Sequence, residues 1–259
     1  NKVLTDTRTR NENELSDSNS IQYSINYTNR LNATGKKLTI DLQYSKSDQD
    51  QAGSIFQNNV FVENNNTIQN SVRKLFQIDY VYPKEDGSQI ELGYRANLDK
   101  SNSDYKNIPL VPYSDPKFDP SNNLDFEQNV YALYAQYGKK YDKLSYLLGL
   151  RTELTDQKIE LLTTNENYNK SYIGLFPTVN LGYEFNDTES ITFGYSKRLR
   201  RPRSYFLNPF ESRSSETNIF KGNVGLDPTY TNSFDVGYLK KLKKVTLNSS
   251  IYYRHSTGI

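Results

Sequence analysis

The stretch Gln89–Leu98, which reads QIELGYRANL, alternates apolar and polar residues along its length. Its apolar side chains are those of Ile90, Leu92, Tyr94, Ala96 and Leu98, and they are separated by Glu91, Gly93, Arg95 and Asn97. Successive side chains of a β-strand point to opposite faces. We therefore predict a strand with one apolar and one polar face.

The same alternation is found in other segments of the chain. They are residues 21–27, 38–45, 76–82, 131–137, 144–150, 179–185, 191–195, 234–238 and 245–253. A period of two favours strands over helices. Residues 126–137 are apolar on both faces, so a helix competes with a strand there. Together with the opening stretch, the pattern predicts ten strands and no helix.

The charged residues of the predicted strands fall on the polar face. They are Asp41, Asp79, Glu91, Arg95, Arg151, Glu184 and Asp235. A charge that faces lipid from a membrane barrel costs about 2–4 kcal/mol at the bilayer midplane, so such a barrel needs an apolar face free of charge. A soluble β-sandwich also segregates its charges, and alternation alone leaves both architectures open.

The connections between the segments favour a barrel. Short connections such as PKEDGS and NDTES alternate with long ones of about 29, 27, 20 and almost 40 residues, the first running from Lys46 to Lys74. Up-and-down barrels of the outer membrane have this rhythm, with tight turns on the periplasmic side and long loops outside. Greek-key sandwiches cross between sheets instead. We predict an all-β, antiparallel up-and-down transmembrane β-barrel.

Tyrosines lie near the strand ends on the apolar face. Tyr27, Tyr82, Tyr137 and Tyr238 are beside short turns, and Tyr44, Tyr195 and Tyr253 are beside long connections. Aromatic girdles at both membrane interfaces have this arrangement.

Composition argues against several classes of function. The 259 residues carry a net charge of only +2, which argues against a nucleic-acid partner. There is no cysteine, and His255 is the single histidine, expected in an exposed loop. Disulfides, thiolate zinc sites, multi-histidine metal sites and Ser-His-Asp catalysis are therefore not expected. We predict no enzyme activity, no catalytic or metal site and no cofactor.

The predicted strand directions place both ends of the chain on the outer side. Single-chain bacterial barrels normally keep their termini in the periplasm. We therefore expect residues 1–259 to be one partial barrel domain, without the plug domain and the final strands. A complete ten-stranded barrel is the alternative.

Motifs in the second half carry a family resemblance. They are Tyr195-Ser196, Arg201-Pro202, Leu207 to Phe210, Gly222 to Pro228, and Gly237-Tyr238. With the flanking hairpin they resemble, over about residues 140–254, the barrel of TonB-dependent outer-membrane receptors, specifically the Bacteroidetes-type outer-membrane β-barrel family. Val224 and Thr229 depart from the residues common in that family, which has Pro and Glu there.

The resemblance implies a function. It implies part of a barrel of about 22 strands in the outer membrane of a Gram-negative bacterium, in contact with lipid and lipopolysaccharide. It also implies ligand-gated uptake of a scarce nutrient (an iron chelate, cobalamin, a glycan or a peptide), with energy from the TonB complex through the missing plug. A passive porin or self-contained ten-stranded barrel, and a soluble all-β binding module or adhesin, are the alternatives.

Four arginines are the candidate ligand-binding residues. Arg198, Arg200, Arg201 and Arg203 leave the eighth strand and enter the longest loop. They form a basic rim at the level of lipopolysaccharide, or salt bridges to neighbouring loops, or else a contact for an anionic ligand at the mouth. The inward charges of the strands wet the lumen and bond to a plug, or else line a substrate path.

Overall fold

The computed structural model describes residues 9–112, 114, 119–213 and 219–258. Ten long strands dominate it: β1 (Arg10–Arg30), β2 (Lys37–Gln57), β3 (Val60–Pro83), β4 (Gln89–Pro109), β5 (Asn122–Tyr141), β6 (Leu144–Leu161), β7 (Glu166–Asn186), β8 (Glu189–Arg200), β11 (Thr229–Lys241) and β12 (Thr246–Thr257). A short helix, α1 (Ser204–Leu207), and a small hairpin of β9 (Glu211–Arg213) and β10 (Ile219–Lys221) lie between β8 and β11.

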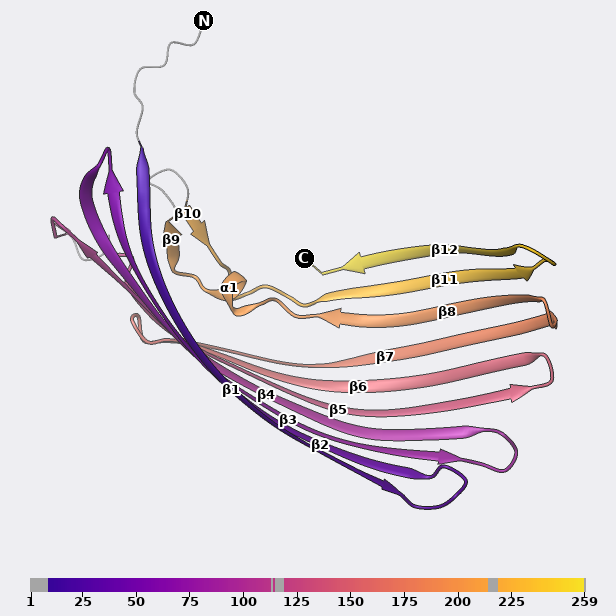
Figure 1. The fold of residues 1–259 in the computed structure, drawn as a ribbon. Helices are drawn as coiled ribbons and strands as arrows, with labels where there is room; N and C mark the ends of the chain where they lie inside the picture. Colours follow the sequence, from indigo (N-terminus) through magenta and orange to yellow (C-terminus); the bar gives the residue numbers. More distant parts are fainter. Residues whose placement is uncertain (1–8, 113, 115–118, 214–218, 259) are drawn as a thin grey trace, which may run out of the picture.

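The ten long strands form one antiparallel sheet in which neighbours in sequence are neighbours in space. Its order is β1-β2-β3-β4-β5-β6-β7-β8-β11-β12. The sheet curves into an open arc with a concave and a convex face, and α1 and the β9–β10 hairpin lie on the concave side (Figure 1). The predicted up-and-down arrangement of ten strands is therefore confirmed.

The strands are longer than the alternation predicted. We call the end that carries the connections 31–36, 84–88, 142–143, 187–188 and 242–245 the tight-turn end, and the opposite end the loop end. At the loop end the connections are residues 58–59, 110–121, 162–165 and 201–228. Arg10 and Thr257 both lie at the loop end, because Arg10 pairs with Gln57 and Thr257 with Tyr230.

The prediction of four long connections is wrong for two of them, because the connections at residues 58–59 and 162–165 are short. The segment from Lys46 to Lys74 is mostly strand, and only Asn58 and Asn59 turn the chain, both with positive φ. Beyond the apolar band these strands carry polar side chains on both faces, as in KSDQDQ at residues 46–51. Backbone pairing continues there without hydrophobic alternation, so the pattern could not reveal it.

Two other predictions are corrected. Residues 126–137, where a helix competed, lie within the strand β5, and α1 is a four-residue helix where none was predicted. His255 is exposed as predicted, but it belongs to β12 rather than to a loop. In the described part of the chain, no helix combines the length and the apolar character needed to cross a membrane.

The convex face is apolar and uncovered. Leu133 is 60% exposed, Leu150 53% and Ile251 78%, although all three belong to well-paired strands. Cross-strand aromatic contacts lie on the same face: the ring centroids of Tyr137 and Tyr146 are 5.9 Å apart near the tight turns. Within the described residues no second sheet packs on this face; the remaining strands form the small hairpin. Lipid is the surrounding that such a face requires.

Candidate functional site: the strap and the concave face

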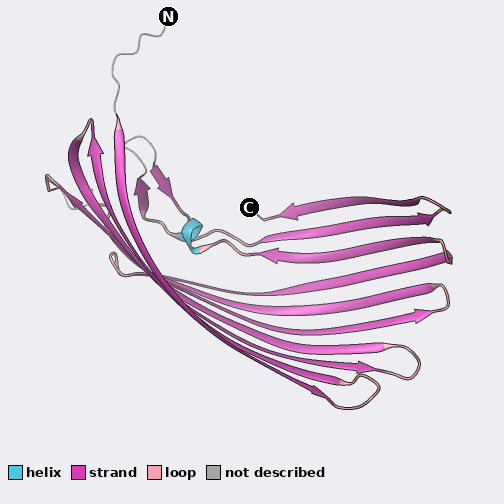
Figure 2. Cartoon of the chain, in the orientation of Figure 1, coloured by secondary structure: helices cyan, strands magenta, loops and turns pink. Residues whose placement is uncertain are grey.

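The connection between β8 and β11 folds back over the concave face instead of extending away from the sheet. We call its described residues, 201–213 and 219–228, the strap. Figure 2 shows its helix and hairpin on the inner side of the arc. The strap is closed on itself by backbone bonds: the amide of Gly222 donates to the Asn208 carbonyl at 2.8 Å, and the amide of Asn223 to that of Phe206 at 2.8 Å.

Glycine is required at position 222. A Cβ atom there would lie 2.5 Å from the Asn208 carbonyl oxygen and 2.6 Å from that of Phe206, both of them backbone atoms. The Gly222 position in the recognised motif therefore has a structural explanation, since it lets the two arms of the strap approach closely.

An apolar cluster holds the strap on the sheet. Leu207, at the end of α1, is 1% exposed and packs against Leu124 and Phe126 of β5 and Ile159 and Leu161 of β6. From further along the strap, partly buried Phe210, Val224 and Leu226 pack on the same cluster. This explains why β5 is apolar on both faces: Phe126 faces inward and lies under the strap, whereas Leu133 faces outward.

Arg201 forms the polar attachment at the start of the strap. Its guanidinium donates to Thr155 Oγ1, from Nε at 3.2 Å and from a terminal nitrogen at 2.8 Å, and also to a carboxylate oxygen of Glu153. The other oxygen of Glu153 accepts from Arg151 Nε at 2.6 Å. Glu153 therefore lies between two guanidinium groups, and its side chain is only 12% exposed.

A third attachment lies at the other end of the strap. Lys170 of β7 donates from Nζ to the Leu226 carbonyl at 3.1 Å and pairs with the Asp227 carboxylate at 2.5 Å. Arg201 and Lys170 are thus on neighbouring parts of the concave face and hold the two ends of the strap.

A hydrogen-bond network covers the concave face nearer the tight turns. Tyr134 lies over Gly93, where a Cβ atom would be 2.2 Å from the ring, and its hydroxyl donates to Asp79. Gln77 donates to Asp79 at 2.7 Å and accepts from Arg95 at 3.3 Å. Arg95 also donates to Asn97 Oδ1 at 3.2 Å. The predicted inward direction of Asp79 and Arg95 agrees with this network.

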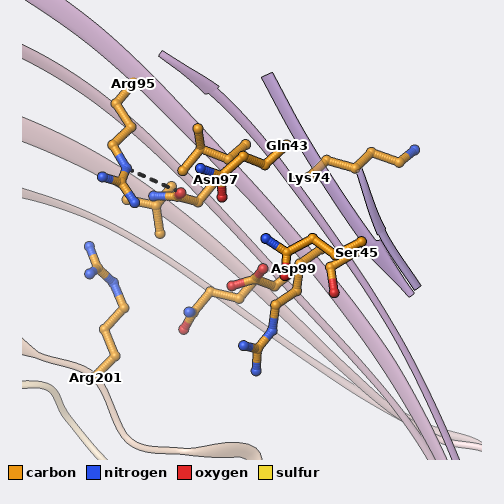
Figure 3. Close-up of a pocket in the computed structure, with 12 residues that line it drawn as sticks. Gln43, Ser45, Lys74, Arg95, Asn97, Asp99 and Arg201 are labelled. Atoms are coloured by element: carbon orange, nitrogen blue, oxygen red, sulfur yellow. Dashed lines mark hydrogen bonds between the residues drawn. The ribbon is translucent and has the colours of Figure 1, made fainter. Parts of the chain in front are cut away.

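A cavity of about 460 Å³ opens on the concave face between this network and the strap. Its charged lining includes Arg73, Arg95 and Arg201, with Asp99 as the carboxylate. In Figure 3 the guanidinium groups of Arg95 and Arg201 face the hollow from opposite sides, while the Lys74 side chain extends away from it. The strap thus completes a cavity whose other walls are strands.

The four arginines predicted from the sequence are only partly gathered. Arg198 and Arg200 belong to β8, and Arg201 and Arg203 to the strap. Arg200, Arg201 and Arg203 line a second cavity of about 430 Å³, together with Phe206 and Asp227, but Arg198 is not part of its lining. Their role in ligand binding stays a prediction. Nothing in the sequence pattern distinguishes Arg73, and the alternation of β4 places Arg95 inward without assigning it to a site.

The tight-turn end carries its own ion pair. Lys139 Nζ lies 2.8 Å from the Asp86 carboxylate in the β3–β4 turn. The hydrogen bonds from Lys139 and Ser88 hold the pKa of Asp86 well below its ordinary value. Across the residues that the structure places, no group of three or more His, Cys, Asp or Glu side chains could hold a metal ion.

Solved structures of outer-membrane receptors share this fold. The unliganded ferric citrate transporter FecA matches with a TM-score of 0.68 at 12% identity, over 92% of this chain and 34% of FecA. The hemophore receptor HasR of Serratia marcescens matches with a TM-score of 0.61 at 13% identity, over 94% of this chain and 40% of HasR. The ferric-catecholate import receptor Fiu of E. coli K12 matches with a TM-score of 0.60 at 10% identity, over 92% of this chain and 40% of Fiu.

The chain therefore spans between a third and two fifths of these receptors, and at such identities the likeness is one of fold. That fold is the barrel of TonB-dependent receptors, as the motifs of the second half predicted. No curated protein matches the chain. A family match extends over residues 29–259 and includes the strap and every long strand except most of β1. The chain belongs to the outer membrane protein beta-barrel family.

Proposed function

We propose that this chain forms part of the barrel of a ligand-gated, TonB-dependent receptor that imports a scarce nutrient across the outer membrane of a Gram-negative bacterium. In this proposal residues 1–259 are one partial domain of a barrel of about 22 strands. The convex face contacts lipid, with lipopolysaccharide at the loop end. Energy comes from the TonB complex through a plug domain outside these residues.

The observation that carries the proposal is the strap on the concave face. The described residues of the strap lie on the concave, lumen side and are fixed there by Leu207, Arg201 and Lys170. A structured segment at the loop end of a barrel lumen suits capture of a ligand rather than free diffusion. The fold shared with FecA, HasR and Fiu supports the same function.

The nutrient classes left open by this proposal are iron chelates, cobalamin, glycans and peptides. A strain of the source bacterium that lacks the gene is compared with its parent, with one of these as the growth-limiting nutrient in each culture. We expect a growth defect on one class, restored by the intact gene. Uptake of that nutrient is then measured with and without a protonophore, because TonB-dependent import needs the inner-membrane proton gradient.

Collapse of the gradient is expected to abolish uptake through the receptor. Uptake that continues unchanged after the protonophore, together with swelling of liposomes that contain the purified protein in small-solute solutions, would instead identify a passive pore. That pair of results contradicts the proposal.

A further inference from the structure

We propose that the cavity lined by Arg73, Arg95 and Arg201 binds the anionic groups of the imported ligand, and that this ligand carries two or more carboxylate or phosphate groups. This inference rests on the proposed function, because it assigns a chemical class to the ligand of that receptor. It concerns a different set of residues from the four arginines of the sequence motif, with which it shares only Arg201.

The charges around the cavity are unbalanced in favour of cations. Asp99 is the carboxylate of the lining, against the three guanidinium groups. Asp99 interacts electrostatically with Arg73. The hydrogen bonds of Arg95 within the described chain go to the neutral amides of Gln77 and Asn97. Arg95 therefore keeps a full positive charge to offer to a ligand.

Arg201 is only partly neutralised. Its carboxylate partner, Glu153, is shared with Arg151, so one negative charge serves two guanidinium groups. The cavity consequently presents an excess of positive charge from both of its sides, from β4 and from the strap. Guanidinium groups form paired, charge-assisted hydrogen bonds with carboxylates and phosphates, which makes an oxyanion the complementary ligand.

The remaining lining suits a polar ligand. Gln22, Gln43, Ser45, Asn97 and Gln128 supply amide and hydroxyl groups that bond to hydroxyls or to further oxygens. The volume of about 460 Å³ lies within the range of about 300–1,000 Å³ found for sites of small organic molecules. Two sources of positive charge on different elements, Arg95 on β4 and Arg201 at the start of the strap, match a ligand with more than one anionic group.

The cavity lies on the loop-end side of the apolar band. On the convex face of β3 the apolar run from Tyr82 through Phe76 gives way to Lys74 at this level, so the cavity lies at the loop-side margin of the apolar band. One of its walls is the first residue of the strap, and the strap closes over the concave face beside it (Figures 2 and 3). A ligand entering at the loop end meets this charge before it reaches the network around Tyr134.

The test uses the full-length protein purified in detergent and titrated by calorimetry at low salt. The probes are tricarballylate and inorganic pyrophosphate, with glycerol as the uncharged control. We expect saturable binding of at least one anion and none of glycerol. In the double variant Arg73→Gln/Arg95→Gln the affinity should fall at least tenfold, whereas Arg73→Lys/Arg95→Lys, which keeps the charges, should retain more binding than the Gln pair.

The matched control is Arg30→Gln/Arg254→Gln, which removes the same charge from exposed residues outside the cavity and should change the affinity less than twofold. Absence of saturable binding by either anion, or an equal loss in both double variants, overturns the proposal. If the intact protein binds no anion but Arg73→Gln/Arg95→Gln lowers its own stability, an acidic side chain of the protein occupies the cavity, and the proposal also fails.

The two proposals can fail separately. Energised uptake that persists in a protein without anion binding would leave the receptor function standing and remove the anionic ligand. Anion binding with uptake that is insensitive to the protonophore would do the reverse.

Discussion

Glu153 is the residue on which the start of the strap depends. Its carboxylate accepts from both Arg151 and Arg201, and Arg201 in turn holds the strap on Thr155. In Glu153→Gln, one neutral amide faces two half-buried guanidinium groups. We expect a loss of about 2 kcal/mol in the free energy of unfolding, typical of leaving buried charged groups without a full partner. Denaturant unfolding of the lipid-inserted protein measures it.

Glu160→Gln is the control for that loss. Glu160 lies on the same strand and pairs with Lys158 at 2.6 Å, but the two side chains are 30% and 48% exposed. An exposed pair contributes about 0–1 kcal/mol, so this substitution should have little effect. Equal losses in the two variants would contradict the structural role given to Glu153.

Leu207 carries the apolar attachment of the strap. In Leu207→Ala the side chain that fills the cluster on β5 and β6 is lost, and large-to-small changes in such sites cost about 2–5 kcal/mol. We expect faster hydrogen exchange throughout the strap, with the long strands unaffected. Leu162→Ala removes the same atoms from a 51%-exposed side chain and is the control; a strap that exchanges equally fast in both variants contradicts the attachment.

At this scale the sequence predicts which way a side chain faces, but not which partner it meets. The alternation predicts the inward direction of Arg151 and Arg95, because every second side chain along a strand points to the same face. The pairing of Arg201 with Glu153 joins residues 48 positions apart through the path of the strap, which no local pattern encodes. Leu207 likewise appeared only as part of a motif.

At the scale of elements, the turn between β3 and β4 is held by an ion pair that responds to pH. Lys139 and Ser88 lower the pKa of Asp86, so the folded state binds this proton less readily than the unfolded state. The contact therefore stabilises the fold above the ordinary pKa of an aspartate, and the stabilisation is lost as the pH falls through the lowered value. We expect Asp86 to titrate below the ordinary range in carbon-detected NMR.

Lys139→Gln tests the cause of that shift. Without the ammonium group the pKa of Asp86 should rise toward its ordinary value, while Lys140→Gln, which breaks a pair with Glu184 instead, should leave it in place. An unchanged titration of Asp86 in Lys139→Gln would show that the Lys139 contact is not its cause.

The strands themselves show where a sequence pattern stops being informative. The apolar band was predicted because lipid requires one uncharged face, and it is there. Beyond the band the same strands continue to Gln57 and from Val60, through stretches such as residues 46–51 whose side chains are polar on both faces. Water or lumen on both sides removes the hydrophobic signal, although backbone hydrogen bonding is unchanged, so the predicted loops were too long.

For the whole molecule, the prediction of ten strands in up-and-down order needed only the apolar face and the tight turns. The curvature of the sheet and the folding of the strap onto its inner face could not be predicted, because they depend on contacts between elements distant in the sequence. The apolar residues on the inner side of β5 were the available signal. From the sequence alone these residues are compatible with a helix or a strand. The structure explains them by their contact with the strap.

The central claim is that the convex face contacts lipid and the concave face does not. Two variants are made, one with a cysteine in place of Leu133 and one with a cysteine in place of Gln136, each in a protein without any other cysteine. The two positions lie three residues apart on β5 and face opposite sides of the sheet. Each is spin-labelled in lipid vesicles, and its relaxation by oxygen and by a water-soluble nickel chelate is measured. We predict strong relaxation by oxygen and little by nickel at position 133, and the reverse preference at position 136. A label at 133 that nickel relaxes as readily as the label at 136 would contradict the account.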